Sequence, residues 1–168
     1  MKKWLTGCLL LGMTSVCSAQ EQTLRDVFRQ MPDSLMPTLT QNNRLDFLDF
    51  LDAGMKAEVK NRLGGTSMMT VLTADSLSLQ MSPALRVDML LLSLAEPIDS
   101  VKQVVVVGET FLTDSLYGET TVRYYTPDWH PVSVPPLSEI QQRRIEGLKL
   151  QTILNWSNDL LNKVKKER

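Results

Sequence analysis

The spacing of hydrophobic residues changes in the first half of the chain. Between Thr40 and Leu63, leucines and other apolar residues recur at three- and four-residue steps, with Leu48 on the apolar side and Asp49 on the polar side. This spacing predicts one long amphipathic helix that begins at Thr40 or Asn42 and ends at the glycine pair 64–65. We expect Leu48 to be buried and Asp49 to face solvent.

After the glycine pair the period becomes two. Apolar and polar side chains alternate without a break over residues 77–81, as expected for a strand with one buried face. Similar patterns, separated by short turn-prone segments, predict strands at 68–73, 77–81, 85–94, 101–107 and 120–126. Connections this short favour an antiparallel meander, because parallel strands need crossovers of a dozen or more residues.

These elements together predict an α+β fold. A short helix at 23–31 and the long helix would pack on a meander of about five strands, because a sheet with one apolar face needs a cover. C-terminal helical segments would follow. Ser138 and Gln141 form a plausible capping box for a helix through about Glu146, ending at Gly147. Residues 148–154 fit either strand or helix, and 156–164 are expected to be helical.

The first residues have the pattern of an export signal. Two lysines, an apolar stretch that is too short to span a bilayer, and small residues up to Ala19 follow one another in this order. We expect cleavage after Ala19. The predicted organisation is a signal peptide at 1–19, a helix-and-meander domain at 20–135, and a C-terminal helical extension at 136–168 that packs on the same domain. The expected location is the periplasm or the extracellular space, without a lipid anchor or a transmembrane segment.

Composition narrows the chemistry of the expected mature chain. Both cysteines, Cys8 and Cys17, lie within the signal, so thiol catalysis and disulfides are not expected. Loss of Lys2 and Lys3 with the signal changes the formal net charge from −1 to −3, which gives no attraction to nucleic acid. The single histidine, His130, excludes zinc sites with several nitrogen or sulfur ligands. We expect no cofactor and no metal.

Several motifs in series are shared with a known family. They lie at residues 31–35, 44–49, 59–65 and 72–79, and the similarity extends from about Phe28 to Trp129. In this order and spacing the sequence resembles an uncharacterised family of small exported proteins from Bacteroides-type bacteria, a domain of unknown function. The resemblance implies export, and it implies no activity, ligand or catalytic residue.

Carboxylates are the remaining candidates for catalysis. Asp46, Asp49 and Asp52 follow one another at three-residue steps, but a straight helix seldom supplies the six or more oxygens of a calcium site. The more economical interpretation is a solvated helix face on which Asp52 meets Lys56. Glycoside hydrolysis needs two facing carboxylates, and the sequence does not pair its candidates. Those candidates are Asp88, Glu109 and Asp128. The catalytic residues therefore stay unknown.

One cluster has the composition of a binding surface. Arginine and aromatic side chains, which dominate binding hot spots, gather at the end of the last predicted strand. The cluster comprises Arg123, Tyr125, Asp128, Trp129 and His130. We predict that Val122 and Tyr124 face the core and that Tyr125 and Trp129 are partly exposed. The alternative is that these aromatic rings belong to the core.

The sequence favours a binding function over catalysis. We expect an exported accessory or binding protein of the cell envelope that acts through a protein or glycan surface. The sequence does not indicate an oligomeric state. The alternative is a small secreted hydrolase that uses an acidic pair.

Overall fold

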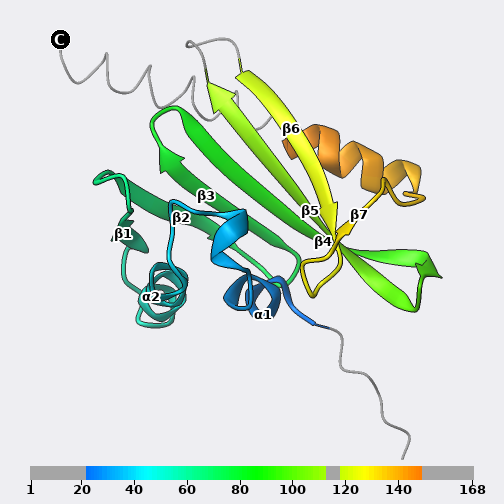
Figure 1. The fold of residues 1–168 in the computed structure, drawn as a ribbon, viewed down its shortest axis with the longest axis horizontal. Coiled ribbons are helices and arrows are strands. Elements are labelled where there is room, and N and C mark those ends of the chain that lie inside the picture. The colour runs from blue at the N-terminus through cyan, green and yellow to red at the C-terminus, as the bar shows by residue number, and fades with distance from the viewer. Residues whose placement is uncertain (1–21, 113–117, 149–168) are drawn as a thin grey trace, which may run out of the picture.

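The protein is built on one seven-stranded antiparallel sheet. The computed structural model describes residues 22–112 and 118–148. The strands lie side by side in chain order, from β1 to β7 (Figure 1). The elements are α1 (Leu24–Arg29), the 3-10 helix η1 (Asp33–Leu35), α2 (Gln41–Asp52), β1 (Glu58–Lys60), β2 (Thr66–Leu72), β3 (Ser76–Ser82), β4 (Leu85–Ile98), β5 (Val101–Leu112), β6 (Gly118–Tyr125) and β7 (Pro131–Val132).

The predicted fold class is wrong. The described residues form mainly a single sheet of seven strands with short helices, and not a five-stranded meander under a long helix. The five expected strand segments correspond to β2 through β6, whereas β1 and β7 were not predicted. Both missed strands are edge strands of two or three residues, which is too short for an alternating pattern to be visible.

The long helix ends early because the chain turns at Gly54. The helix begins as expected: Thr40 accepts a hydrogen bond from the backbone of Asn43, and the Asn43 side chain accepts one from the backbone of Thr40. Gly54 then adopts a φ of 66°, a left-handed conformation that suits glycine and ends the helix. Val59, expected on the helix, is instead the buried centre of β1, and Leu63 is 80% exposed.

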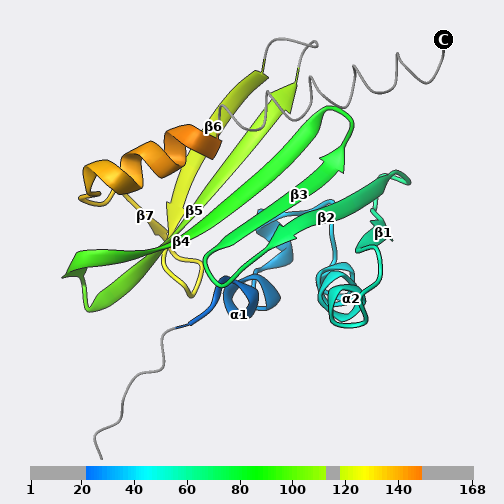
Figure 2. The same ribbon diagram turned by 180° about the vertical axis from the view of Figure 1, so that it is seen from behind.

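The two faces of the sheet carry separate hydrophobic cores. On one face, odd-numbered residues of β3 to β5 pack with the buried side chains of α1 and α2 in the larger cluster. On the other face, Leu90, Leu92, Val104 and Val106 pack with Ile145, which belongs to helical residues 139–148. Figures 1 and 2, seen from opposite sides, show the sheet between the N-terminal helices and this C-terminal helix.

A buried arginine fixes the segment that joins α1 to α2. Arg44 in α2 is 1% exposed. It donates to the carbonyl oxygens of Leu39 and Met31 and forms an ion pair of 2.8 Å with Asp33 in η1. Only its Nε lacks a hydrogen-bond partner among the described residues. The Arg44 side chain thus fixes the connecting segment through the main-chain carbonyls of that segment.

The β4–β5 hairpin is longer than the strands beside it. Ser76, the first residue of β3, lies opposite Leu90, whereas β4 continues to Ile98. Asp99 and Ser100 turn the chain with positive φ values of 45° and 70°. The hairpin therefore projects beyond the end of β3, as both ribbon views show. The part of β4 beyond Leu91 is therefore not paired with β3.

The C-terminal helix begins at the predicted capping box. Ser138 Oγ accepts from the backbone of Gln141 at 3.3 Å, and Gln141 Oε1 accepts from the backbone of Ser138 at 2.9 Å. The expected break at Gly147 is wrong, because residues 139–148 are all helical. The predictions for 1–19, for 156–164 and for most of 148–154 lie outside the described residues. Within 22–112 and 118–148, no helix has both the length and the apolar character needed to cross a bilayer.

Candidate functional site

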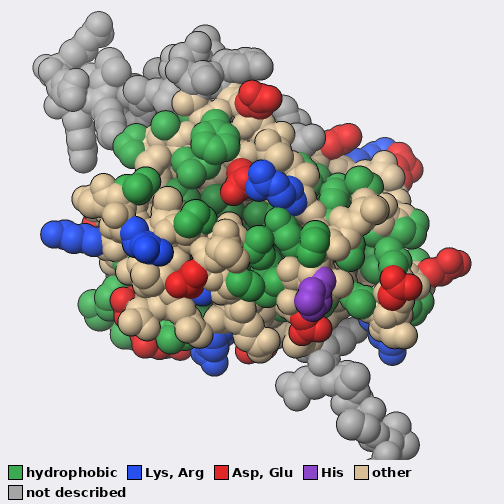
Figure 3. Space-filling view, in the orientation of Figure 1, with side chains coloured by type: hydrophobic (Ala, Val, Ile, Leu, Met, Phe, Trp, Pro, Cys, Tyr) green, Lys and Arg blue, Asp and Glu red, His purple; other side chains and the backbone are tan. Residues whose placement is uncertain are grey.

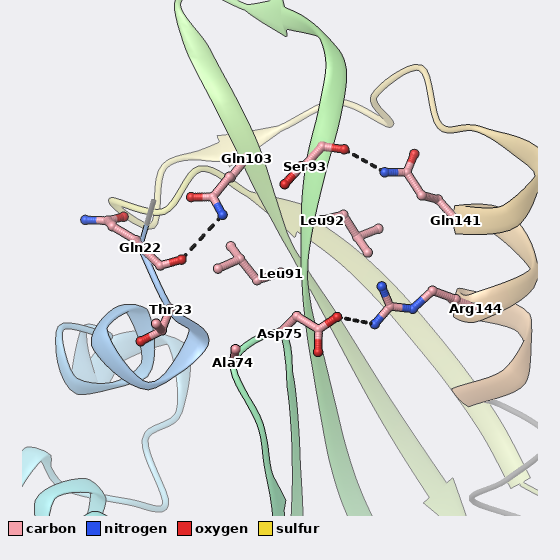
Figure 4. Close-up of a pocket in the computed structure, with 10 residues that line it drawn as sticks. All are labelled: Gln22, Thr23, Ala74, Asp75, Leu91, Leu92, Ser93, Gln103, Gln141 and Arg144. Carbon is pink, nitrogen blue, oxygen red and sulfur yellow. Dashed lines mark hydrogen bonds and ion pairs between the residues drawn. The ribbon is translucent and has the colours of Figure 1, made fainter. Parts of the chain in front are cut away.

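A cleft of about 450 Å³ opens where β3 ends beside the longer β4. Its volume lies within the range of roughly 300–1,000 Å³ that is typical of ligand sites. Five separate segments line it: the residues before α1, the β2–β3 turn, β4, β5 and the C-terminal helix (Figure 4). The lining residues are Gln22, Thr23, Ala74, Asp75, Leu91, Leu92, Ser93, Gln103, Gln141 and Arg144.

The floor of the cleft is the free edge of β4. The backbone N–H of Leu91 donates to the carbonyl of Asp75 at 2.9 Å, which is the last main-chain bond of the β3–β4 pairing. Main-chain groups of alternate residues point to the same side of a strand, so those of Ser93 point to the side where β3 has ended. The Ser93 carbonyl accepts instead from Gln141 Nε2, at 2.7 Å. A side-chain amide therefore occupies the place of a neighbouring strand.

An ion pair closes one end of the cleft. Arg144 Nη2 lies 2.8 Å from Asp75 Oδ2, and the two side chains are 39% and 50% exposed. Thr73 and Ser76 donate their hydroxyls to the other oxygen of Asp75, so the carboxylate is held independently of Arg144. Arg144 and these hydroxyls hold the pKa of Asp75 below its ordinary value, against the opposing effect of burial. Asp75 is therefore ionised at neutral pH.

The opposite wall is formed by the chain that enters α1. Gln103 Nε2 donates to the carbonyl of Gln22 at 3.4 Å, and Leu24 donates its backbone N–H to the carbonyl of Ala74 at 2.7 Å. Thr23 forms the N-terminal cap of α1 with Asp26, whose pKa is lowered by the Thr23 hydroxyl. Main-chain and capping bonds therefore fix this wall.

The two predicted aromatic binding residues are buried. Tyr125 is 9% exposed and Trp129 is 5% exposed, and both belong to the larger core, with ring centroids 5.7 Å apart. The prediction that they are partly exposed is wrong, and Val122 and Tyr124 are the half-buried pair instead. The reason is that α1 covers the Tyr125 face: Trp129 Nε1 donates to the carbonyl of Val27 at 2.9 Å.

The polar members of the predicted cluster are exposed. Asp128 and His130 lie in the turn between β6 and β7, and Arg123 on β6 forms an ion pair with Glu109 on β5. Figure 3 shows that acidic and basic side chains are interspersed over this side of the molecule, without a large patch of one sign. The structure therefore brings none of these three side chains into the cleft, and their binding role stays a prediction.

The carboxylates considered for catalysis do not converge. Glu109 lies opposite Val87, whose side chain is in the larger core, so Asp88, the next residue, points to the other face of the sheet. Asp88 is buried and accepts hydrogen bonds from Ser78 and Arg86. Asp52 forms an ion pair with Arg25 instead of Lys56, and the pair lowers the pKa of Asp52. Among the described residues, no three His, Cys, Asp or Glu side chains lie together as a group that could hold a metal ion.

Sequence reasoning missed the cleft because its residues are far apart in the chain. Asp75 and Arg144 are separated by 69 positions. The available signal was the unequal length of the strands predicted at 77–81 and 85–94, which indicates a free strand edge but not the residues that lie beside it. Gln141 was identified only as a cap, yet the same side chain also bonds to Ser93.

Comparison with known proteins identifies a family and a similar fold. Residues 16–157 match the family described as "Protein of unknown function (DUF3256)". A domain of an uncharacterized protein from Porphyromonas gingivalis W83 has a similar structure, with a TM-score of 0.53 and 24% identity over 71% of this chain. This chain spans 65% of that chain, and the likeness concerns the fold alone. No curated protein matches the sequence. The predicted resemblance to a family of unknown function is confirmed, but these matches say nothing about export.

Proposed function

We propose a function from the chain's own site, because the chain belongs to the DUF3256 family of proteins of unknown function. The protein is a binding protein of the cell envelope that takes its ligand in the cleft at the end of β3. The observation that carries this proposal is the convergence of five segments on one polar cavity. Ligand sites are usually concave and contain a few fixed polar groups that orient the ligand, and this cleft has both features.

The chemistry of the cleft favours binding over hydrolysis. Of its ten lining residues, Asp75 is the single carboxylate, so a pair of catalytic carboxylates is not present there. Its lowered pKa keeps Asp75 ionised, which is unfavourable for a general acid at neutral pH. The lining contains glutamine, serine and threonine side chains, which are suited to hydrogen bonding.

Filling the cleft tests this proposal. Ser93 is exposed and lines the cleft, so Ser93→Trp should occupy the space without a large effect on the core. We expect immobilised wild-type protein to retain material from a native envelope extract, and Ser93→Trp to lose it. The comparison variant is Thr121→Trp, on the exposed face of β6 next to Arg123. Loss with Thr121→Trp alone would transfer the function to the predicted surface around Arg123 and contradict the cleft proposal.

The proposed location rests on the N-terminal sequence. Export would be followed by cleavage between Ala19 and Gln20, because small residues precede this bond after an apolar stretch. N-terminal sequencing of the protein from its native host tests this step. A mature chain that still begins at Met1 would contradict export.

A further inference from the structure

We propose that the cleft binds the C-terminal end of an extended peptide, which adds to β4 as a short strand and places its terminal carboxylate on Arg144. This inference rests on the proposed binding function and specifies its ligand. It follows from three features of the cleft: a free strand edge, a blocked end, and a guanidinium with unused donors.

The free edge selects an extended main chain. Ser93 directs its backbone groups into the cleft, and its carbonyl already accepts an amide N–H, that of Gln141. A peptide strand offers the same kind of donor, together with a carbonyl for the backbone N–H of Ser93. Adding a strand to a free sheet edge is a common form of peptide recognition.

The blocked end requires that the peptide terminates in the cleft. In line with β3 the path is closed by the turn at Asp75, because Leu91 is bonded to that residue. From Ser93 to Leu91 the strand advances about 7 Å, at roughly 3.3 Å per residue. A chain that pairs with Ser93 therefore reaches the Asp75–Arg144 pair within about two residues and must stop there.

The direction of the sheet determines which end of the peptide this is. All neighbouring strands in the sheet are antiparallel, and a peptide antiparallel to β4 runs in the same direction as β3. Since β3 starts at this end of the cleft and runs away from it, the peptide approaches β3 with its C-terminus first. The group that meets Arg144 is then a carboxylate.

Arg144 can bind this carboxylate while it stays near Asp75. Its hydrogen bonds within residues 22–112 and 118–148 use Nη2 alone, to Asp75 and Ser76, which leaves Nη1 and Nε without partners among these residues. Figure 4 shows the guanidinium and Gln141 projecting from one helix toward the cleft. If Arg144 turns away from Asp75, the hydroxyls of Thr73 and Ser76 still bond to that carboxylate. The cation is therefore available at little cost.

The test compares two probes that differ only in the terminal group. The probes are an acetylated Thr-Val-Thr-Val peptide with a free C-terminal carboxylate and the same peptide with a C-terminal amide, titrated into the full chain and followed by backbone NMR. We expect shifts at Leu92 and Ser93, and about tenfold tighter binding of the free carboxylate, in line with a charge-assisted hydrogen bond. Equal affinity for the two probes, or shifts confined to other residues, would overturn the inference.

Two variants on the same helix sharpen this test. Arg144→Gln should abolish the preference for the free carboxylate, whereas Arg143→Gln should preserve it, because Arg143 is exposed and paired with Glu139. Gln141→Ala should tighten binding, since the peptide no longer has to displace the Gln141 amide from Ser93. Ser138→Ala is the control, because it also weakens the helix cap but leaves the Gln141 amide on Ser93. Weaker binding by Gln141→Ala than by Ser138→Ala would show that Gln141 itself holds the ligand and would contradict strand addition.

The inference and the proposed function can fail separately. If the cleft retains envelope glycan and neither peptide binds, the peptide inference is wrong and the binding function stands. A third probe, Thr-Val-Thr-Val with a free N-terminus and an amidated C-terminus, tests the opposite direction. If this probe binds best, the strand is parallel to β4 and the carboxylate assignment is wrong. If Ser93→Trp retains envelope material as well as the wild type does and neither peptide binds, both proposals are wrong.

Discussion

Two arginine–aspartate pairs in this molecule have the same separation and opposite surroundings. Arg44 and Asp33 lie 2.8 Å apart, as do Arg144 and Asp75. Arg44 is 1% exposed and bonds mainly to main-chain carbonyls, whereas Arg144 is 39% exposed and bonds to side chains. A buried cation that loses its partners cannot replace them with water, which makes the loss costly. A half-exposed cation can exchange its partners for water or a ligand. The closed region under α1 and α2 is therefore structural, whereas the pair at the cleft can exchange partners, as the proposed function requires.

The largest effect is expected where a charge enters the closed region. Leu48→Asp places a carboxylate at a fully buried position of α2, which costs several kcal/mol and approaches a total stability of roughly 5–15 kcal/mol. Thermal melts should show a variant that is unfolded or barely folded. The control Asp49→Ala, at an exposed neighbour, should melt within a few degrees of the wild type. The reverse ranking would mean that α2 is rotated and that its acidic side is functional.

Removal of the buried cation should have the next largest effect. Arg44→Ala leaves the carbonyls of Met31 and Leu39 without their donor, and at about 1–3 kcal/mol for each unsatisfied group it should reduce the free energy of unfolding by about 2–6 kcal/mol. Asp33→Asn should cost less than Arg44→Ala, because the half-exposed side chain keeps an oxygen that accepts from Arg44, and the two carbonyl bonds remain. Urea denaturation measures both variants. Similar losses from the two substitutions would show that the ion pair, and not burial, determines the contribution of Arg44.

A moderate effect is expected at the contact between α1 and the β6–β7 turn. Trp129→Phe keeps an aromatic ring but removes the donor to the Val27 carbonyl, which should cost about 1–3 kcal/mol in urea denaturation. The exposed neighbour provides the control: His130→Ala should change stability by no more than about 0.5 kcal/mol. A Trp129→Phe variant as stable as the wild type would argue that the indole hydrogen bond does not hold α1.

The smallest effect on stability should come from the cleft. Arg144→Gln should cost less than about 1 kcal/mol, because the pair with Asp75 is half-exposed. The folded-state pKa of Asp75 is lowered, so the pair stabilises the fold above the unfolded value of about 3.9, and this contribution is lost as the pH falls through the folded value. The difference in melting temperature between wild type and variant should therefore be present at pH 7 and shrink below about pH 4. A difference that grows in acid would contradict the assigned pair.

Local patterns predicted the elements whose side chains repeat at a regular step. Residues 77–81 alternate and form most of β3, and the capping box at Ser138 marks the start of a helix. The same reasoning was wrong at Val59, because a spacing of four residues between apolar side chains also fits a turn followed by a strand. The left-handed conformation of Gly54 ends the helix there, and the apolar pattern does not indicate this conformation.

The site was harder to predict because it depends on how elements meet. Tyr125 and Trp129 have the composition of a binding surface, but α1 covers them. Arg144 was not singled out among the charged residues of its helix, since nothing local distinguishes it from the exposed Arg143. The difference between them is the position of the β2–β3 turn, which only the tertiary structure provides.

The order of the sheet has a consequence for how the protein folds. Every strand pairs with its neighbour in sequence, so each pairing closes a short loop and the sheet can grow hairpin by hairpin. The bonds with the largest sequence separation attach the N-terminal segment: Trp129 to Val27 across 102 positions, and Gln103 to Gln22 across 81. These contacts should form after the transition state, so Trp129→Phe should accelerate unfolding and leave the folding rate nearly unchanged in stopped-flow measurements. Gln22 and Thr23 form a wall of the cleft, so the proposed binding site would be the last part of the molecule to be completed.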